Sequence, residues 1–134
     1  MVSDSPPDRQ RPLSPNIQIY RPQLTSVLSI VHRLTGMLLS VAAIALVIWL
    51  LAAERGPRAY AVVQGAFASW PGQVTLFVCT FAFFLHLFGG IRHLVWDTVH
   101  GFELQTIYIS GWTVVAVSIV ATAAAWIASF YMGS

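Results

Sequence analysis

Three long apolar stretches dominate the pattern of hydrophobic and polar positions in this chain. Uncharged runs of 20, 33 and 31 residues occupy positions 34–53, 59–91 and 104–134. A helix needs about 20 apolar residues to cross the hydrocarbon core of a bilayer. The pattern therefore predicts an all-α membrane protein with three transmembrane helices, at residues 24–53, 74–98 and 107–131.

The segments between these spans contain residues that break helices. An outer loop is predicted at residues 54–73, because it opens with Glu-Arg-Gly-Pro and has Pro-Gly before the second span. Within this loop, the apolar residues 59–70 are consistent with a short interfacial helix. An inner turn that contains His-Gly-Phe-Glu is predicted at residues 99–106.

The first 23 residues are predicted to form a cytoplasmic or interfacial segment that precedes the membrane. Three prolines between residues 11 and 23 disfavour a regular helix there, and residues 1–10 have the composition of a disordered tail. The first ten residues also lack the apolar region of a signal peptide. An ordinary cleaved signal is therefore not expected.

Composition supports a membrane location and narrows the set of partners. Hydrophobic residues make up 57% of the chain and charged residues 9%, with a mean hydropathy of +0.71, as in integral membrane proteins. All seven basic residues are arginines spread along the chain, so no clustered basic face indicates nucleic-acid binding. Cys79 is the single cysteine and is expected to be a buried, inert thiol.

The distribution of arginines predicts the orientation in the membrane. The N-terminal side of the predicted bundle has five arginines and the opposite side has two: Arg9, Arg11, Arg21, Arg33 and Arg92 against Arg55 and Arg58. The positive-inside rule then places the N-terminus in the cytoplasm and the C-terminus on the other side. Three short helices leave much apolar surface uncovered, so we expect them to form part of a bundle with another subunit.

His86 is an ionisable residue in the middle of the second predicted span. Such a residue at bilayer depth is energetically costly and indicates a functional site. His93 lies seven residues later on nearly the same helix face, about 10 Å closer to the inner side. Gly89 and Gly90 lie between the two histidines and leave room for a flat group. A histidine beside such a space suggests an axial ligand of haem iron.

The other histidines are expected near the inner boundary or in a loop, so that His86 is isolated at mid-membrane depth. A second haem ligand would then have to come from a different chain. The alternative is a neutral imidazole that is simply hydrogen-bonded to a hydroxyl of a neighbouring helix.

A second polar cluster is predicted where the start of the first span meets the end of the second. Its members from the two spans are Ser29, His32 and Arg33, and Arg92, His93 and Asp97. A hydroxyl, an imidazole and a guanidinium near one point can hydrogen-bond a carbonyl group and deliver protons to it. Asp97 is one turn beyond His93 and is placed to orient its imidazole. The alternative is that the arginines simply extend to lipid headgroups.

Two blocks of sequence resemble a known family. The first is Arg-Pro-Leu-Ser-Pro-Asn-Ile-Gln-Ile-Tyr at residues 11–20 with Ser-Ile-Val-His-Arg-Leu-Thr-Gly at 29–36, and the second is His-Leu-Phe-Gly-Gly-Ile-Arg-His-Leu-Val-Trp-Asp at 86–97. Both blocks resemble the cytochrome b subunit of succinate dehydrogenase, and the resemblance covers about residues 11–131. Asn16 departs from the pattern, because many relatives have histidine there.

The resemblance implies a membrane anchor for a flavoprotein subunit and an iron–sulfur subunit, paired with a second small hydrophobic anchor. It implies a location in the bacterial inner membrane, in contact with lipid, in preference to the mitochondrial inner membrane. The chain itself has no flavin fingerprint and no cysteine set for an iron–sulfur cluster. It is therefore not expected to oxidise succinate alone.

The resemblance also implies roles for individual residues. His86 matches the axial ligand of one haem b that the two anchor subunits share, and His32 and Arg33 match positions near the haem propionates. Ser29 and Arg33 match positions that line the site of the substrate ubiquinone. Asp97 matches a position implicated in proton handling at that site.

Several alternatives stay open from the sequence. The role of His93 is not assigned, and the motifs fit both succinate oxidation and fumarate reduction, with ubiquinone favoured over menaquinone. A haem-free anchor is one alternative function. Another is a small proton- or ion-conducting subunit in which His86 and Asp97 act as relay groups.

Overall fold

The computed structural model describes residues 21–133, which form four helices and no strand. The helices are α2 (Leu24–Glu54), α3 (Pro57–Ala68), α4 (Trp70–Asp97) and α5 (Leu104–Gly133). Three of them, α2, α4 and α5, are long and apolar enough to cross a membrane. The prediction of an all-α protein with three spanning helices is confirmed. The predictions made for residues 1–20, including the N-terminal segment and the block at 11–20, lie outside the described residues.

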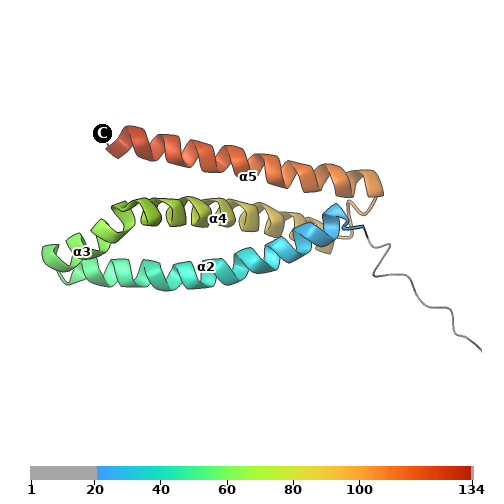
Figure 1. Cartoon of the computed structure of the whole chain (residues 1–134). Coiled ribbons are helices and arrows are strands. Elements are labelled where there is room, and N and C mark those ends of the chain that lie inside the picture. The colour runs from blue at the N-terminus through green and yellow to red at the C-terminus, as the bar shows by residue number, and fades with distance from the viewer. Residues whose placement is uncertain (1–20, 134) are drawn as a thin grey trace, which may run out of the picture.

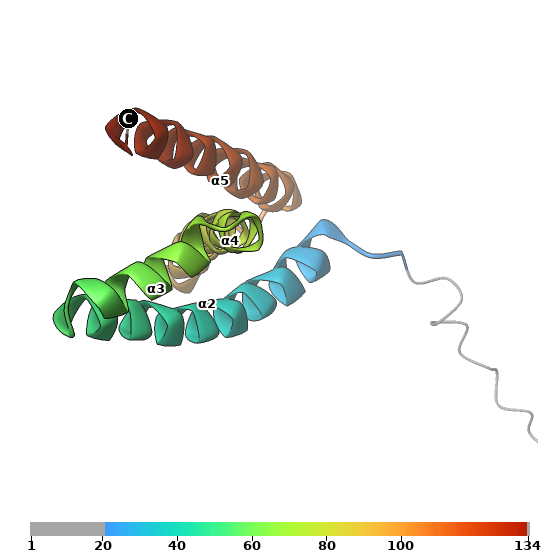
Figure 2. The ribbon, with the colours of Figure 1, turned by 60° about the vertical axis from the view of Figure 1, so that its left-hand side comes forward.

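Helix α4 is the central element of the bundle. Figure 1 shows α4 between α2 and α5, with the start of α2, the end of α4 and the start of α5 at one end of the molecule. The short helix α3 lies at the other end, where it contacts α2 and α4 (Figure 2). Helices α2 and α5 also touch, because Gly111 leaves space for Leu24 and Leu28. Side chains on α4 can therefore reach both neighbouring spans.

Local sequence explains why the segment after α2 is mostly helical. Gly56 adopts a φ of 106°, which favours glycine, and Pro57 then stands in the first turn of α3, where a missing N–H is tolerated. The hydroxyl of Ser69 accepts a hydrogen bond from the Gly72 N–H at 3.3 Å and caps α4. As a result, α4 begins at Trp70, before the expected residue 74. Helix α5 likewise begins at residue 104 and not at 107.

The buried core of the described chain is small. Four apolar residues are buried, namely Ala52, Ala82, Leu85 and Val114, together with four polar ones, namely Thr35, Arg92, Ser118 and Thr122. The hydroxyls of Ser118 and Thr122 donate to backbone carbonyls one turn earlier at 2.6 and 2.7 Å, so their burial leaves no donor unpaired. Most large apolar side chains lie on the outer surface, which suits contact with lipid or with other membrane chains.

Candidate functional site

Three imidazoles meet where α2 packs against α4. The rings of His32 on α2 and His86 on α4 are stacked, with centroids 4.0 Å apart and planes 5° from parallel. The ring of His93 meets His32 edge-on at 5.1 Å. The expectation that His86 is isolated at its depth is therefore wrong. The sequence placed His32 near the membrane boundary, but the way α2 packs on α4 brings the two rings into contact.

Hydrogen bonds fix the tautomer of the neutral His86 ring. Its Nδ1 lies 3.1 Å from the backbone carbonyl oxygen of His32 and 3.1 Å from the Thr35 hydroxyl. The Thr35 hydroxyl donates its one proton to the same carbonyl at 2.8 Å. A carbonyl oxygen can only accept, so Nδ1 of His86 must donate. In the neutral ring the lone pair is then on Nε2, which has no hydrogen-bond partner within residues 21–133.

Each of the two helices provides a glycine against the imidazole of the other. A Cβ atom at Gly36 on α2 would lie 3.1 Å from Cε1 of His86. A Cβ atom at Gly89 on α4 would lie 3.0 Å from Nδ1 of His32. The sequence predicted that Gly89 leaves room for a flat group, and the structure fills this room with the His32 ring. The glycine next to His86 is Gly36, which the sequence analysis had not connected with it.

The Nδ1 atom of His32 is buried and has no hydrogen-bond partner among the described residues. A small cavity of about 20 Å³ lies beside it and is also lined by Gly89, Arg92 and His93. This volume is enough for about one water molecule, and a water there would have several polar neighbours.

The three residues predicted to bind quinone lie at the same end of the bundle. Ser29 is half-buried and Arg33 exposed on α2, and Asp97 is exposed at the end of α4. In the described part of the chain, none of their side chains has a hydrogen bond or ion pair. His32 does not share their environment, because its ring turns towards α4 while Arg33 stays on the outer surface. The expected pairing of Asp97 with His93 does not form.

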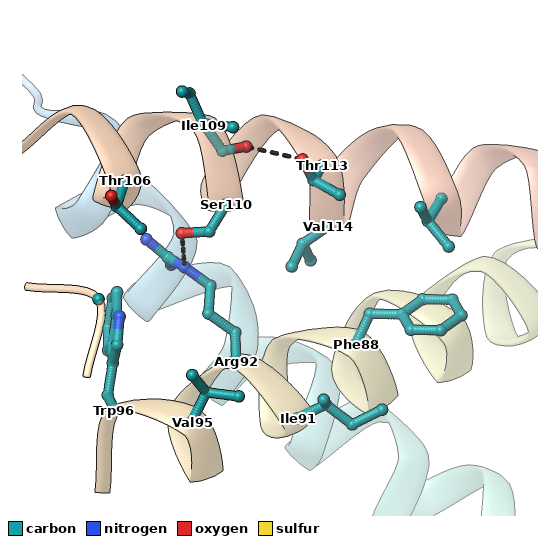
Figure 3. Close-up of a pocket in the computed structure, with 12 residues that line it drawn as sticks. Phe88, Ile91, Arg92, Val95, Trp96, Thr106, Ile109, Ser110, Thr113 and Val114 are labelled. Atoms are coloured by element: carbon teal, nitrogen blue, oxygen red, sulfur yellow. Dashed lines mark hydrogen bonds between the residues drawn. The ribbon is translucent and has the colours of Figure 1, made fainter. Parts of the chain in front are cut away.

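Arg92 has a role that the sequence analysis missed. Its side chain is 8% exposed and points from α4 to α5, where Nε donates to the Ser110 hydroxyl at 2.9 Å (Figure 3). Nη2 donates to the Ile107 carbonyl at 2.9 Å. The guanidinium carbon lies 4.0 Å from the centroid of the Trp96 ring. The four-residue spacing of Arg92 and Trp96, one helical turn, was the sequence signal that could have predicted their contact. Arg92 therefore forms a buried link between two spans and does not simply extend from the outer surface towards the headgroups.

Fold and site together define a class of protein: a multi-pass, all-α membrane protein with a histidine cluster between two of its spans. Comparison with known sequences identifies the family to which this protein belongs. Residues 7–125 match the family described as succinate dehydrogenase/fumarate reductase transmembrane subunit, and the chain belongs to this family.

Proteins from several organisms are similar over most of the chain. A succinate dehydrogenase cytochrome b556 subunit of Rickettsia conorii is 36% identical over 118 residues, which cover 88% of this chain and 92% of that protein. The cytochrome b556 subunit of Paracoccus denitrificans is 36% identical over 110 residues, or 82% and 85% of the two chains. The cytochrome b560 subunit of Reclinomonas americana is 32% identical over 123 residues, or 87% and 85%. The three spans and the bacterial relatives indicate a multi-pass protein of the bacterial inner membrane.

Proposed function

We propose that this chain is the cytochrome b membrane anchor of a succinate:quinone oxidoreductase, that it binds one haem b through His86, and that it forms part of the ubiquinone site. Membership of the family and the names of the relatives support the anchor role. The observation that carries the haem assignment is the hydrogen bonding of His86 Nδ1. Its Nδ1–H is held by a backbone carbonyl, which leaves the Nε2 lone pair available.

The surroundings of His86 fit an iron ligand. Metal-binding histidines commonly donate their second ring N–H to a carbonyl or carboxylate, which fixes the tautomer and the ring orientation. In His86 the Nδ1–H is the donor, and the carbonyl oxygen of His32 and the hydroxyl oxygen of Thr35 are the acceptors. Haem iron takes four ligands from the porphyrin, so one imidazole from this chain is sufficient. Haem b, when bound, supplies a one-electron redox centre.

A second ligand of the haem iron would come from the partner anchor subunit. The lone pair of Nε2 lies in the plane of the His86 ring. The His32 ring is stacked over the face of His86 and so does not lie in the direction of that lone pair. Instead, His32 supports one face of the His86 ring. A role of His32 and Arg33 at the haem propionates rests on the family resemblance alone. A ligand from another chain would make the haem a link between the two anchors.

Ser29, Arg33 and Asp97 are proposed to hold and protonate the quinone. The Arg33 guanidinium and the Ser29 hydroxyl are donors that would bind a quinone carbonyl oxygen and stabilise negative charge on it. The exposed carboxylate of Asp97 stands at the end of α4, where protons can arrive from the aqueous side. Because these side chains have no partner among residues 21–133, they suit a site that other subunits complete.

The proposed partners are a flavoprotein subunit, an iron–sulfur subunit and a second hydrophobic anchor. We further propose that the N-terminus lies in the cytoplasm, on the basis of the arginine distribution. Electrons from the soluble subunits would then arrive at the end of the bundle that carries Ser29, Arg33 and Asp97. A reporter enzyme that is active only in the cytoplasm, fused at either terminus, tests this orientation. Reporter activity is expected from the N-terminal fusion, and activity from the C-terminal fusion would contradict the proposed orientation.

The haem assignment is tested in the complex purified through a tag on this chain. We expect the other subunits to co-purify and the dithionite-reduced minus oxidised spectrum to show a low-spin b-type haem. In the assembled complex, His86→Ala should abolish this spectrum, whereas His100→Ala, which changes an exposed histidine after α4, should leave it intact. A complex without haem would favour the haem-free anchor. A chain that purifies without any dehydrogenase subunit would favour the ion-conducting alternative.

The quinone assignment is tested by comparing two activities of the same complex. Arg33→Gln and Ser29→Ala should lower succinate:ubiquinone activity by about tenfold or more, because each removes a donor to the quinone oxygen. Succinate oxidation by a water-soluble acceptor that takes electrons from the soluble subunits should not change. Arg58→Gln is the matched control, since Arg58 is exposed on α3 at the opposite end. Equal activity with ubiquinone in Arg33→Gln and Arg58→Gln would refute the assignment.

A further inference from the structure

Arg92 is a buried cation without an anionic partner in the described chain. Two of its five N–H donors are used, one by the Ser110 hydroxyl and one by the Ile107 carbonyl, and both acceptors are neutral. Among residues 21–133, no carboxylate forms an ion pair with the guanidinium, and Nη1 has no hydrogen-bond acceptor. An uncompensated charge in a membrane protein is costly. The arrangement therefore predicts an anion from outside the described chain.

A cavity of about 430 Å³ lies between α4 and α5, and Arg92 is one of the residues that line it (Figure 3). Its polar end is formed by Arg92, Trp96 and Thr106, and the hydroxyl of Thr106 has no partner within the described residues. The rest of its lining is largely apolar and includes Phe88, Val114 and Val117. The cavity thus has a largely apolar lining, with the buried guanidinium of Arg92 at one end.

The position and length of this cavity match an amphiphile in the bilayer. Arg92 is five residues before the end of α4, or about 8 Å along the helix, and so lies within reach of the headgroup region. From Thr106 to Val117 the cavity extends along α5 by about 16 Å, which is comparable to half of a hydrocarbon core. A phosphate offers oxygen pairs that match the planar guanidinium.

We propose that the cavity between α4 and α5 binds an anionic phospholipid, with its phosphate on Arg92 and Thr106 and an acyl chain along Val114 and Val117. A headgroup with a net negative charge is favoured over a zwitterionic one, because its negative charge neutralises the positive charge of the buried guanidinium. Trp96 covers one face of the guanidinium. The cavity lies on the α5 side of α4 and the stacked imidazoles on the α2 side, although Arg92 and Val114 also line the small cavity beside His32. The proposed lipid site does not depend on the proposed haem.

The test uses the purified complex, stripped of bound lipid and titrated in native mass spectrometry with phosphatidylglycerol or phosphatidylcholine of the same acyl chains. We expect one site that prefers phosphatidylglycerol. Arg92→Gln should weaken phosphatidylglycerol binding about fivefold and remove the preference, as expected for one basic group at a lipid headgroup. Arg58→Gln removes an exposed arginine far from the cavity and should change the binding of neither lipid.

A second variant separates the cavity from the charge. Val117→Trp fills the apolar part without touching the guanidinium, and it should weaken the binding of both lipids. The proposal is overturned if the unmodified complex binds the two lipids equally, or if Arg92→Gln retains the preference. It is also overturned if Val117→Trp binds both lipids normally, or if it blocks assembly of the complex, since the groove would then be occupied by another subunit. A change of the haem spectrum in Arg92→Gln with unchanged lipid binding would assign Arg92 to a haem carboxylate instead.

Discussion

Adding one methyl group at two glycines should change stability in opposite directions. Gly36 lies on α2 against the His86 ring, where a Cβ atom would come within 3.1 Å of Cε1. Gly65 lies in α3, and a Cβ atom there would meet nothing within 4 Å. The His86 ring cannot simply retreat from Gly36, because its Nδ1 is hydrogen-bonded and its face is stacked on His32. Gly36→Ala and Gly65→Ala are therefore the same chemical change in two different surroundings.

The expected magnitudes follow from two opposing effects. Replacing glycine by alanine inside a helix is favourable by about 1 kcal/mol, and both variants gain this. Overpacking a filled interior costs about 1–3 kcal/mol, and Gly36→Ala alone incurs this cost. We expect Gly65→Ala to stabilise the chain slightly and Gly36→Ala to destabilise it. The difference between the two variants isolates the packing effect and should be about 1–3 kcal/mol.

The chain provides its own probe for this measurement. Cys79 is the single cysteine, is half-buried on α4, and lines a cavity with Leu38 and Leu76 between α2 and α4. Its rate of thiol labelling during an SDS titration of the purified complex, measured on this chain after separation from the other subunits, reports separation of these helices. Labelling of Gly36→Ala should begin at a lower SDS fraction than in the unmodified complex. If Gly36→Ala and Gly65→Ala shift the titration equally, the close packing of Gly36 on His86 is refuted.

Two further substitutions test individual hydrogen bonds. Thr35→Val keeps the shape of the side chain but removes one acceptor from His86 Nδ1, so it should cost about 1 kcal/mol in the same titration; no shift would mean that the Thr35 contact is not needed to hold the ring. Ser110→Ala removes the acceptor of the Arg92 Nε–H and should cost about 1–3 kcal/mol, since the donor is charged and buried. Thermal unfolding of the complex checks the second effect, and a stability equal to that of the unmodified complex would contradict the buried link between α4 and α5.

The fold was largely predictable because hydropathy alone determines which segments enter the membrane. Uncharged runs identified three spans without any tertiary information. The helical structure of α3 and the early start of α4 depended on local details, namely a cap at Ser69 and the backbone of Gly56, that hydropathy does not report. A short helix near residues 59–70 was predicted from the sequence, and the structure has a helix at Pro57–Ala68.

The chemistry of the site was predictable by residue type, but its contacts were not. His86 stood out because an imidazole is rare at that depth, and this needs only the position in the span. The stacking of His32 on His86 depends on how α2 and α4 are rotated against each other, which a single sequence does not specify. The direction of Arg92 towards Ser110 depends on the packing of α5 in the same way. The sequence therefore grouped His32 and Arg92 by their similar depth in the membrane. In the structure they belong to different helix interfaces, His32 to the one between α2 and α4 and Arg92 to the one between α4 and α5.

The central claim is that Nε2 of His86 is available to bind haem iron, and ligand replacement tests it most directly. In the assembled complex, His86→Gly removes the imidazole and leaves a space beside Gly36 that free imidazole can enter. We predict that the low-spin b-type spectrum disappears in His86→Gly and returns when imidazole is added to the solution. A low-spin spectrum that is unchanged in His86→Gly without imidazole would contradict the claim.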